Sequence, residues 1–183
     1  AQTLKRLDEL SGNYTQVAMK IWNWAELGYQ ETKSSQLLQD ELRAAGFKVE
    51  AGVADMPTAF VASFGSGKPV IGILGEFDAL PGVSQAAVPT RQERPEVKSG
   101  HACGHHLFGS GSAAAVVAVK EWLQKSGKSG TIRFYGTPAE EGGGNAVLLE
   151  GGVVEVAEHG ALVGMLHGEV VVRPFPQPRL GHV

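Results

Sequence analysis

Residues 99–109 concentrate the side chains best suited to chemistry. They hold three histidines and the only cysteine of the chain, set among glycines. Thiolate and imidazole are the ligands that zinc and related transition metals prefer in proteins. Cys103 and His105 stand two positions apart, and the glycines allow a turn sharp enough to aim both at one centre. On this stretch alone, a buried structural thiol beside surface histidines remains the alternative.

Further polar groups follow three predicted strands. These are Asp78 after an apolar run at 70–74, Glu140 and Glu141 after an alternating run at 131–135, and His167 after a run at 161–166. In open α/β sheets, ligands gather beyond the carboxyl ends of parallel strands. We therefore expect these side chains to meet the loop of Cys103 and His105 at one edge of a sheet.

The adjacent carboxylates of Glu140 and Glu141 suit a divided role. Neighbouring side chains in an extended loop point in different directions, so one can bind a metal ion while the other faces the substrate. In a metal-assisted hydrolase, the second carboxylate accepts a proton from the attacking water and returns it to the leaving amine. Pro138 and Ala139 before the pair, and three glycines after it, favour a constrained site over a solvated surface pair.

Several other polar side chains near these segments can be interpreted in more than one way. Asp78 is either a metal ligand or a group that orients a ligand imidazole, and a turn residue is the plainer alternative. Glu76 is predicted to be exposed. His101 and His106 are expected to support the site from behind or to face the substrate. A Cys103 nucleophile with a histidine base fits the surrounding glycines and acidic pair less well than a metal site does.

Hydrophobic periodicity predicts alternating helices and strands. The predicted helices cover 3–27, with a break near 11–13, and 33–45, 112–124 and 146–150. The predicted strands cover 47–49, 58–64, 70–74, 131–135 and 161–166. Residues 83–100 are expected to form a long loop, and residues 169–183, with three prolines, to be irregular. This alternation predicts an α/β fold with a largely parallel sheet flanked by helices.

Composition narrows the class of partner. A chain of 183 residues is long enough for one domain with a real core. Its formal net charge of -3, without a basic cluster, argues against nucleic acid or an anionic membrane as a partner, and no apolar run has the length of a membrane span. A single cysteine excludes an intramolecular disulfide. We expect a cytoplasmic protein, or a periplasmic or secreted one if a signal peptide preceded Ala1.

Three segments together resemble the M20 metallopeptidase family, and within it the amidohydrolases that cleave p-aminobenzoyl-glutamate. These are residues 75–81, 101–105 and 136–143. The resemblance implies a zinc-exopeptidase-like catalytic domain, of which residues 1–183 would form the N-terminal part, with an irregular tail at 168–183. The lid domain that often forms the family's dimer is expected to be absent from this chain. The full-length parent is expected to be a homodimer or a hetero-oligomer.

The resemblance also implies an enzyme with two divalent metal ions, Mn²⁺ or Zn²⁺. The positions that match the family's ligands are Cys103, His105, Glu141 and, further along, His167. Glu140 matches the general base, and Asp78 matches an aspartate near the site. The implied substrate is a small N-acyl amino acid or dipeptide-like molecule such as p-aminobenzoyl-glutamate, hydrolysed at its amide. The alternatives are an inactive or metal-binding-only fragment and a related N-acyl amino acid deacylase.

Overall fold

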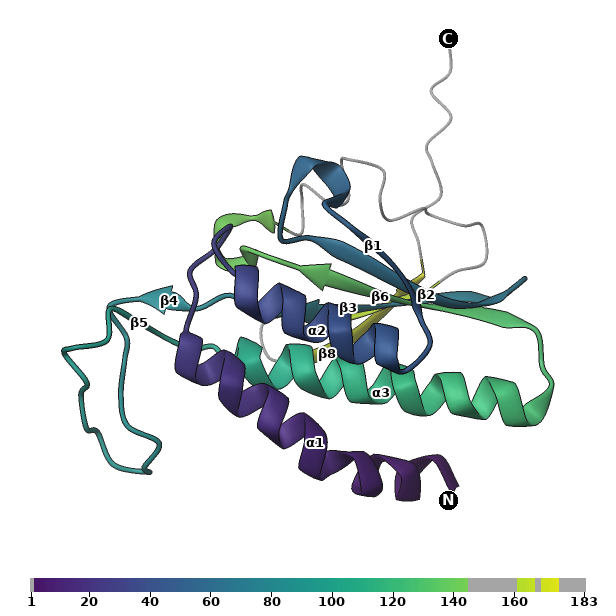
Figure 1. Cartoon of the computed structure of the whole chain (residues 1–183), viewed down its shortest axis with the longest axis horizontal. Helices are drawn as coiled ribbons and strands as arrows, with labels where there is room; N and C mark the ends of the chain where they lie inside the picture. The colour runs from purple at the N-terminus through teal and green to yellow at the C-terminus, as the bar shows by residue number, and fades with distance from the viewer. Residues whose placement is uncertain (1, 145–160, 167–168, 175–183) are drawn as a thin grey trace, which may run out of the picture.

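A six-stranded sheet and three α-helices form the part of the chain that the computed structural model describes, residues 2–144, 161–166 and 169–174 (Figure 1). The helices are α1 (Gln2–Trp24), α2 (Thr32–Ala44) and α3 (His105–Ser126). The sheet strands are β1 (Lys48–Ala51), β2 (Phe60–Ser66), β3 (Val70–Glu76), β6 (Gly130–Thr137), β7 (Ala161–Leu166) and β8 (Glu169–Pro174). A small ribbon pairs β4 (Leu80–Pro81) with β5 (Ser99–Gly100), and the short 3-10 turns are η1 (Val53–Asp55) and η2 (Glu140–Gly142).

The sheet has the strand order β1-β2-β6-β3-β7-β8. Its centre is parallel, since β3 runs parallel to both β6 and β7. The outer pairs β1–β2, β2–β6 and β7–β8 are antiparallel. The α/β class is thus confirmed, but the sheet is mixed rather than largely parallel. The connections within β1–β2 and β7–β8 are too short for a parallel crossover, which needs a dozen or more residues.

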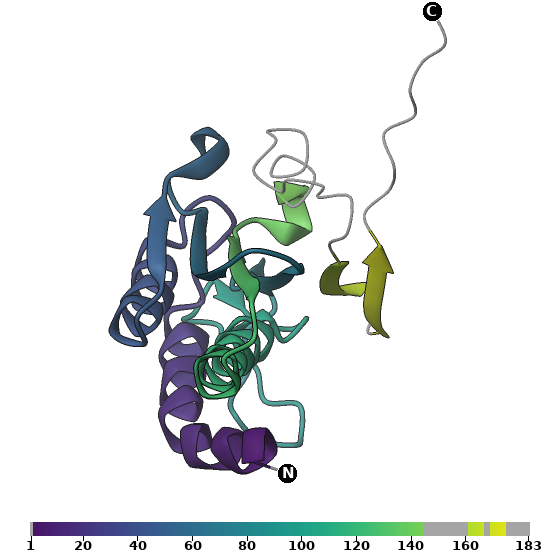
Figure 2. The ribbon, with the colours of Figure 1, turned by 90° about the vertical axis from the view of Figure 1, so that its right-hand side faces the viewer.

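All three helices cover the same face of the sheet (Figures 1 and 2). The main core fills the space between them and the strands, with Ile21 from α1, Leu38 from α2, Val116 from α3 and Phe134 from β6. A smaller cluster around Tyr135 lies on the opposite face. Successive side chains of β6 therefore pack into apolar clusters on opposite faces of the sheet, as in a strand buried on both sides.

Helix α3 begins at His105, seven residues before the predicted start. Glycine and serine at 109–112 have weak helix propensity, which favours a later start. Packing overrides that preference at Gly109, where a Cβ would lie 2.3 Å from the carbonyl oxygen of Glu76. The missing side chain lets the first turns of α3 lie directly against the end of β3, so His105 becomes part of a rigid helix.

Predictions for the first helix and for the tail are also wrong. Helix α1 continues through 11–13 because Gly12 lies on its open side while Tyr14 and Val17 anchor the helix in the core. It ends at Trp24 rather than near residue 27. The tail predicted to be irregular contains β8, whose consecutive valines at 170–172 pair with β7. The helix predicted at 146–150 lies outside the described residues. No described helix has the length and apolarity that crossing a membrane would require.

Candidate metal centre

The carboxyl edge of the parallel strands brings the predicted site residues together. Glu76 at the end of β3 pairs in register with Thr137 at the end of β6, so both strands end at the same level. Asp78 follows β3, and Glu140 and Glu141 form the turn η2 after β6. The start of α3 reaches the same edge. The inference drawn from strand order alone is therefore confirmed for these segments.

His105 lies at the centre of this edge. Its Nδ1 donates to the Asp78 carboxylate, with Nδ1 2.8 Å from Oδ1, and lies 3.2 Å from the Asp78 carbonyl oxygen. Its Nε2 faces three other carboxylates, at 3.3 Å from Glu76, 3.8 Å from Glu140 and 4.0 Å from Glu141. Burial lowers the pKa of His105, but Asp78, with further help from Glu76 and Glu140, outweighs it and raises the pKa to about 9.

Asp78 holds two neighbours of the site at once. One carboxylate oxygen accepts the His105 proton, and the other accepts the backbone N–H of Glu141 at 3.2 Å. The side chain is buried, so water competes little for these bonds. A carboxylate that takes the second nitrogen of an imidazole fixes its tautomer and aims its free nitrogen. Of the two roles predicted for Asp78, the geometry favours orientation over direct ligation.

Two groups of described side chains have the geometry to hold a metal ion. Cys103, His105 and Glu141 form one group, and Glu76, His105 and Glu140 form the other. In each group the ligand atoms all lie within 4.8 Å of one another. The first group consists of predicted ligands only. Sulfur, nitrogen and carboxylate oxygen are the donors of a zinc-type site, so the residues present fit a divalent cation.

The prediction for Glu76 is wrong. Only 4% of this residue is exposed, because β3 continues two residues beyond the predicted strand and Glu76 remains inside the sheet. A buried carboxylate at a strand end needs a charged or hydrogen-bonding partner. Its oxygen lies 3.3 Å from the His105 ring, which places it in the centre rather than on the surface. The sequence signal is an acid one glycine beyond the apolar run at 70–74.

Cys103 lies at the open side of the centre, where it is exposed. A hydrogen bond to Glu141, followed by burial of the thiol and the charges of Glu141, Glu140 and Asp78, raises its pKa to about 11. The metal-free thiol therefore keeps its proton at neutral pH. A divalent cation would reverse this preference, since it offsets the surrounding negative charge and binds the thiolate form.

His101 and His106 lie behind the ligands rather than among them. Their ring centroids are 4.9 Å apart, and His101 Nε2 lies 3.2 Å from the carbonyl oxygen of Ile21. Burial lowers the pKa of both, for His106 to about 4 with help from His101 and His105. Both rings are therefore neutral at pH 7 and support the loop of Cys103 by packing. His167, the fourth predicted ligand, lies outside the described residues.

The family model described as Peptidase family M20/M25/M40 matches residues 72–174. The chain is 47% identical over 146 residues to a subunit of the p-aminobenzoyl-glutamate hydrolase of Escherichia coli (strain K12), a match that covers 78% of this chain and 30% of that protein. It is 27% identical to hippurate hydrolase of Campylobacter jejuni, over 80% of this chain and 37% of that protein. The chain thus spans about a third of the length of these relatives.

The fold also matches solved structures. A putative aminohydrolase from methicillin-resistant Staphylococcus aureus superposes with a TM-score of 0.73 at 23% identity, over 89% of this chain and 41% of that one. A dinuclear metal binding peptidase of the M20 family from Bacillus subtilis gives a TM-score of 0.66 at 24% identity, over 85% and 43%. The fold of this chain is therefore also found in these two solved structures.

Proposed function

Because the chain belongs to the peptidase family M20/M25/M40, we propose that it forms the metal-binding part of an amidohydrolase that cleaves the amide of an N-acyl amino acid. The observation that carries the proposal is the cluster of Cys103, His105 and Glu141, whose ligand atoms lie within 4.8 Å of one another. A second acid, Glu140, lies 3.8 Å from the same imidazole. This proximity supports a division of roles in which Glu141 is a ligand and Glu140 is the base that hydrolysis requires.

The cofactors proposed are two divalent ions, Mn²⁺ or Zn²⁺. Cys103, His105 and Glu141 would hold the first ion, with Asp78 fixing His105. Glu76 lies at 3.3 Å from His105 and would contribute to the second, together with His167, which stays a predicted ligand. When bound, such ions polarise a substrate carbonyl and make water acidic enough to attack it at neutral pH.

Glu140 is the proposed proton carrier. It is part-buried at the open side of the centre, beside but not inside the group of Cys103, His105 and Glu141. Its carboxylate would take a proton from the attacking water and give it to the amine that leaves.

The proposed substrate has a carboxylate next to the cleaved amide, as in p-aminobenzoyl-glutamate. Its support is the activity for which the E. coli relative is named, since the chain shares 47% identity with that protein. A related deacylase acting on other N-acyl amino acids would use the same centre. A panel of p-aminobenzoyl-glutamate, hippurate and N-acetyl amino acids separates the two substrate classes by their relative rates.

Glu140→Gln tests the assignment of roles. We expect this variant to bind Zn²⁺ or Mn²⁺ as the wild type does and to lose turnover of p-aminobenzoyl-glutamate. Metal content is measured on this chain, and turnover on this chain and on any longer protein that contains it. Glu50→Gln, at an exposed position of β1, is the matched control and leaves both properties unchanged. Loss of metal from the Glu140 variant would show that ligand and base have been exchanged. A loaded wild type without turnover on the whole panel would favour the metal-binding-only alternative.

A further inference from the structure

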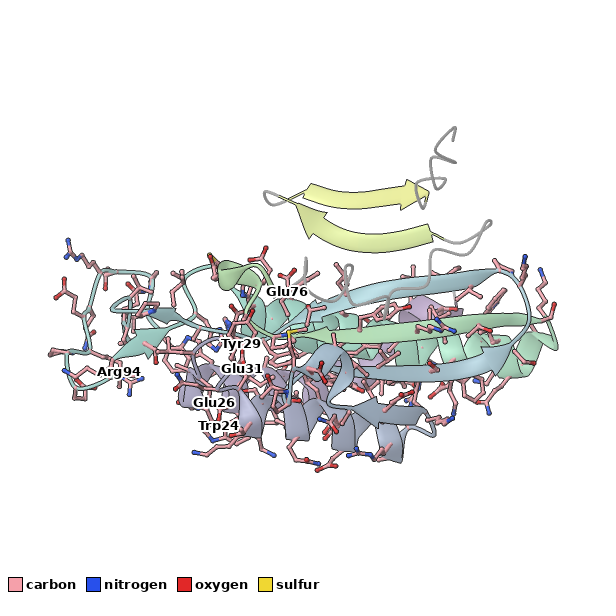
Figure 3. The ribbon with its side chains drawn as sticks, turned by 90° about the horizontal axis from the view of Figure 1, so that it is seen from above. Trp24, Glu26, Tyr29, Glu31, Glu76 and Arg94 are labelled. Atoms are coloured by element: carbon pink, nitrogen blue, oxygen red, sulfur yellow. The ribbon has the colours of Figure 1, made fainter. Side chains whose placement is uncertain are left out.

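The connection between α1 and α2, residues 25–31, contacts two of the loops that carry the metal centre, those after β3 and β6. The carbonyl oxygen of Glu26 accepts the N–H of Ala79 at 2.9 Å, and Leu27 forms a parallel bridge with the same residue, next to Asp78. Glu26, Tyr29 and Glu31 lie at the same end of the sheet as Glu76 (Figure 3). Residues far apart in the sequence are thus tied together where the proposed ligands lie.

Glu31 is the buried polar group of this connection. None of its surface is exposed, although a carboxylate is rarely buried without partners. One oxygen accepts the N–H of Ala139 at 2.8 Å, and the other accepts the hydroxyl of Thr58 at 3.1 Å. Burial raises the pKa of Glu31, and these hydrogen bonds oppose the increase. Its carboxyl group therefore joins the connection to the loop after β6 and to the segment before β2.

Ala139 has a conformation that needs such support. Its φ of 52° and ψ of 41° lie in the left-handed region, which is sterically unfavourable for a residue with a Cβ. Its carbonyl oxygen accepts the N–H groups of Gly142 and Gly144 at 2.9 and 2.8 Å. A Cβ built on Gly28 would lie 2.9 Å from the Ala139 methyl, so this methyl lies directly against the 25–31 connection. Ala139 is thus held at its N–H, its side chain and its carbonyl.

We infer that Glu31 is a positioning residue, whose buried carboxylate holds the turn at Ala139 so that Glu140 and Glu141 face His105. Without this acceptor, Ala139 relaxes toward the ordinary backbone regions, which rotates the two glutamates that follow it. The inference rests on the proposed function, because the consequence that matters is the strength of metal binding at the same centre. Glu31 touches neither the ions nor the substrate and acts through the backbone.

Three variants of the chain test this role. Glu31→Leu fills the same space without an acceptor, and Glu31→Gln restores one. Gly28→Ala disturbs the same turn by a different contact, because its new methyl would press against the Ala139 methyl. This variant keeps the inference testable if Glu31→Leu fails to fold. Glu26→Ala is the matched control. It removes the carboxylate that accepts the N–H groups of residues 33 and 34 at the start of α2, so it destabilises the same connection without touching Ala139.

The first measurement is amide hydrogen exchange of the metal-free chain. We expect Glu31→Leu to speed exchange at Ala139 by about tenfold, the value of one lost hydrogen bond. Glu31→Gln and Glu26→Ala should leave this amide at the wild-type rate. The second measurement is the Kd for Zn²⁺, which should weaken by about 10- to 100-fold in Glu31→Leu and also weaken in Gly28→Ala. It should stay unchanged in Glu31→Gln and Glu26→Ala.

Wild-type exchange at Ala139 together with wild-type Zn²⁺ affinity in Glu31→Leu would overturn the inference. So would an equal loss of affinity in Glu26→Ala, because general destabilisation would then explain both. If the wild type itself binds no Zn²⁺ while the exchange pattern is as expected, the proposed function fails but Glu31 still holds the turn. The two failures are therefore distinguishable.

Discussion

Gly109→Ala tests how closely α3 must approach β3 for the centre to form. A Cβ at this position would lie 2.3 Å from the carbonyl oxygen of Glu76 and 3.3 Å from its carbonyl carbon. Ordinary contact requires about 1 Å more, so helix and strand must separate by about that distance. His105 lies one helical turn away on α3, and its distance from the Glu76 carboxylate increases with the separation.

Gly111→Ala is the matched control in the same helix. A Cβ there meets no atom within 4 Å. Replacing glycine by alanine inside a helix stabilises it by about 1 kcal/mol, and this gain applies to both variants. At Gly109 the collision with backbone adds an overpacking cost of about 1–3 kcal/mol. We therefore expect Gly111→Ala to unfold at a higher urea concentration than the wild type, and Gly109→Ala at the same or a lower one.

Urea unfolding of the metal-free chain, followed by circular dichroism, gives the free energy of unfolding of each variant. The two variants should differ by about 1–3 kcal/mol, the overpacking cost alone. Titration with Zn²⁺ should show weaker binding in Gly109→Ala and wild-type binding in Gly111→Ala. Equal stability of the two variants would refute the close approach of α3 to Glu76. Wild-type Zn²⁺ binding by a destabilised Gly109→Ala would show that the centre tolerates the separation.

Three further changes test individual groups. Asp78→Ala removes the acceptor for the His105 ring and for the Glu141 amide, so Zn²⁺ affinity should fall by about 10- to 100-fold in competition with a chelating dye; unchanged affinity would contradict the orienting role. Cys103→Ser replaces a soft donor by a hard one, so it should weaken Zn²⁺ more than Mn²⁺, and equal losses in paired titrations would argue against Cys103 as a ligand. The raised pKa of Glu31 means that the folded chain binds a proton more readily than the unfolded one. The free energy of unfolding of the metal-free wild type, relative to Glu31→Gln, should therefore fall as pH rises from the ordinary pKa of 4.5 through the raised pKa of the folded chain. Urea unfolding at several pH values measures this difference. A difference that stays flat or rises with pH would refute the shift.

Strand order and periodicity are sufficient to predict which groups meet. The predicted strands at 70–74 and 131–135, each followed by acidic residues, predict an edge at which Asp78, Glu140 and Glu141 approach the loop of Cys103. This meeting is confirmed because the strands that carry these groups, β3 and β6, are parallel and end in register. The antiparallel outer strands do not affect it, since none of the described candidate ligands follows them.

The errors occur where distant packing decides local structure. Gly109 favours a loop by its propensity, and only the approach to Glu76 makes it helical. Glu76 suggests the surface by its charge, but it is buried beside the His105 ring, 3.3 Å away. Glu31 gives no signal at all, because its partners Ala139 and Thr58 are 108 and 27 positions away in the sequence. Periodicity indicates which face is buried and carries no information on such pairings.

The arrangement around His105 also limits how two ions can be held. Both ligand groups found among the described residues include this imidazole. Its Nδ1–H donates a hydrogen bond to Asp78, so Nε2 is the nitrogen that can bind a metal. One imidazole nitrogen binds one ion. One of the two groups can therefore use His105 at a time. If His105 binds an ion together with Cys103 and Glu141, that ion has one sulfur, one nitrogen and one oxygen donor. The other group then keeps only the carboxylates of Glu76 and Glu140. His167, which stays a predicted ligand, would add an imidazole to these two carboxylates if a second ion binds there.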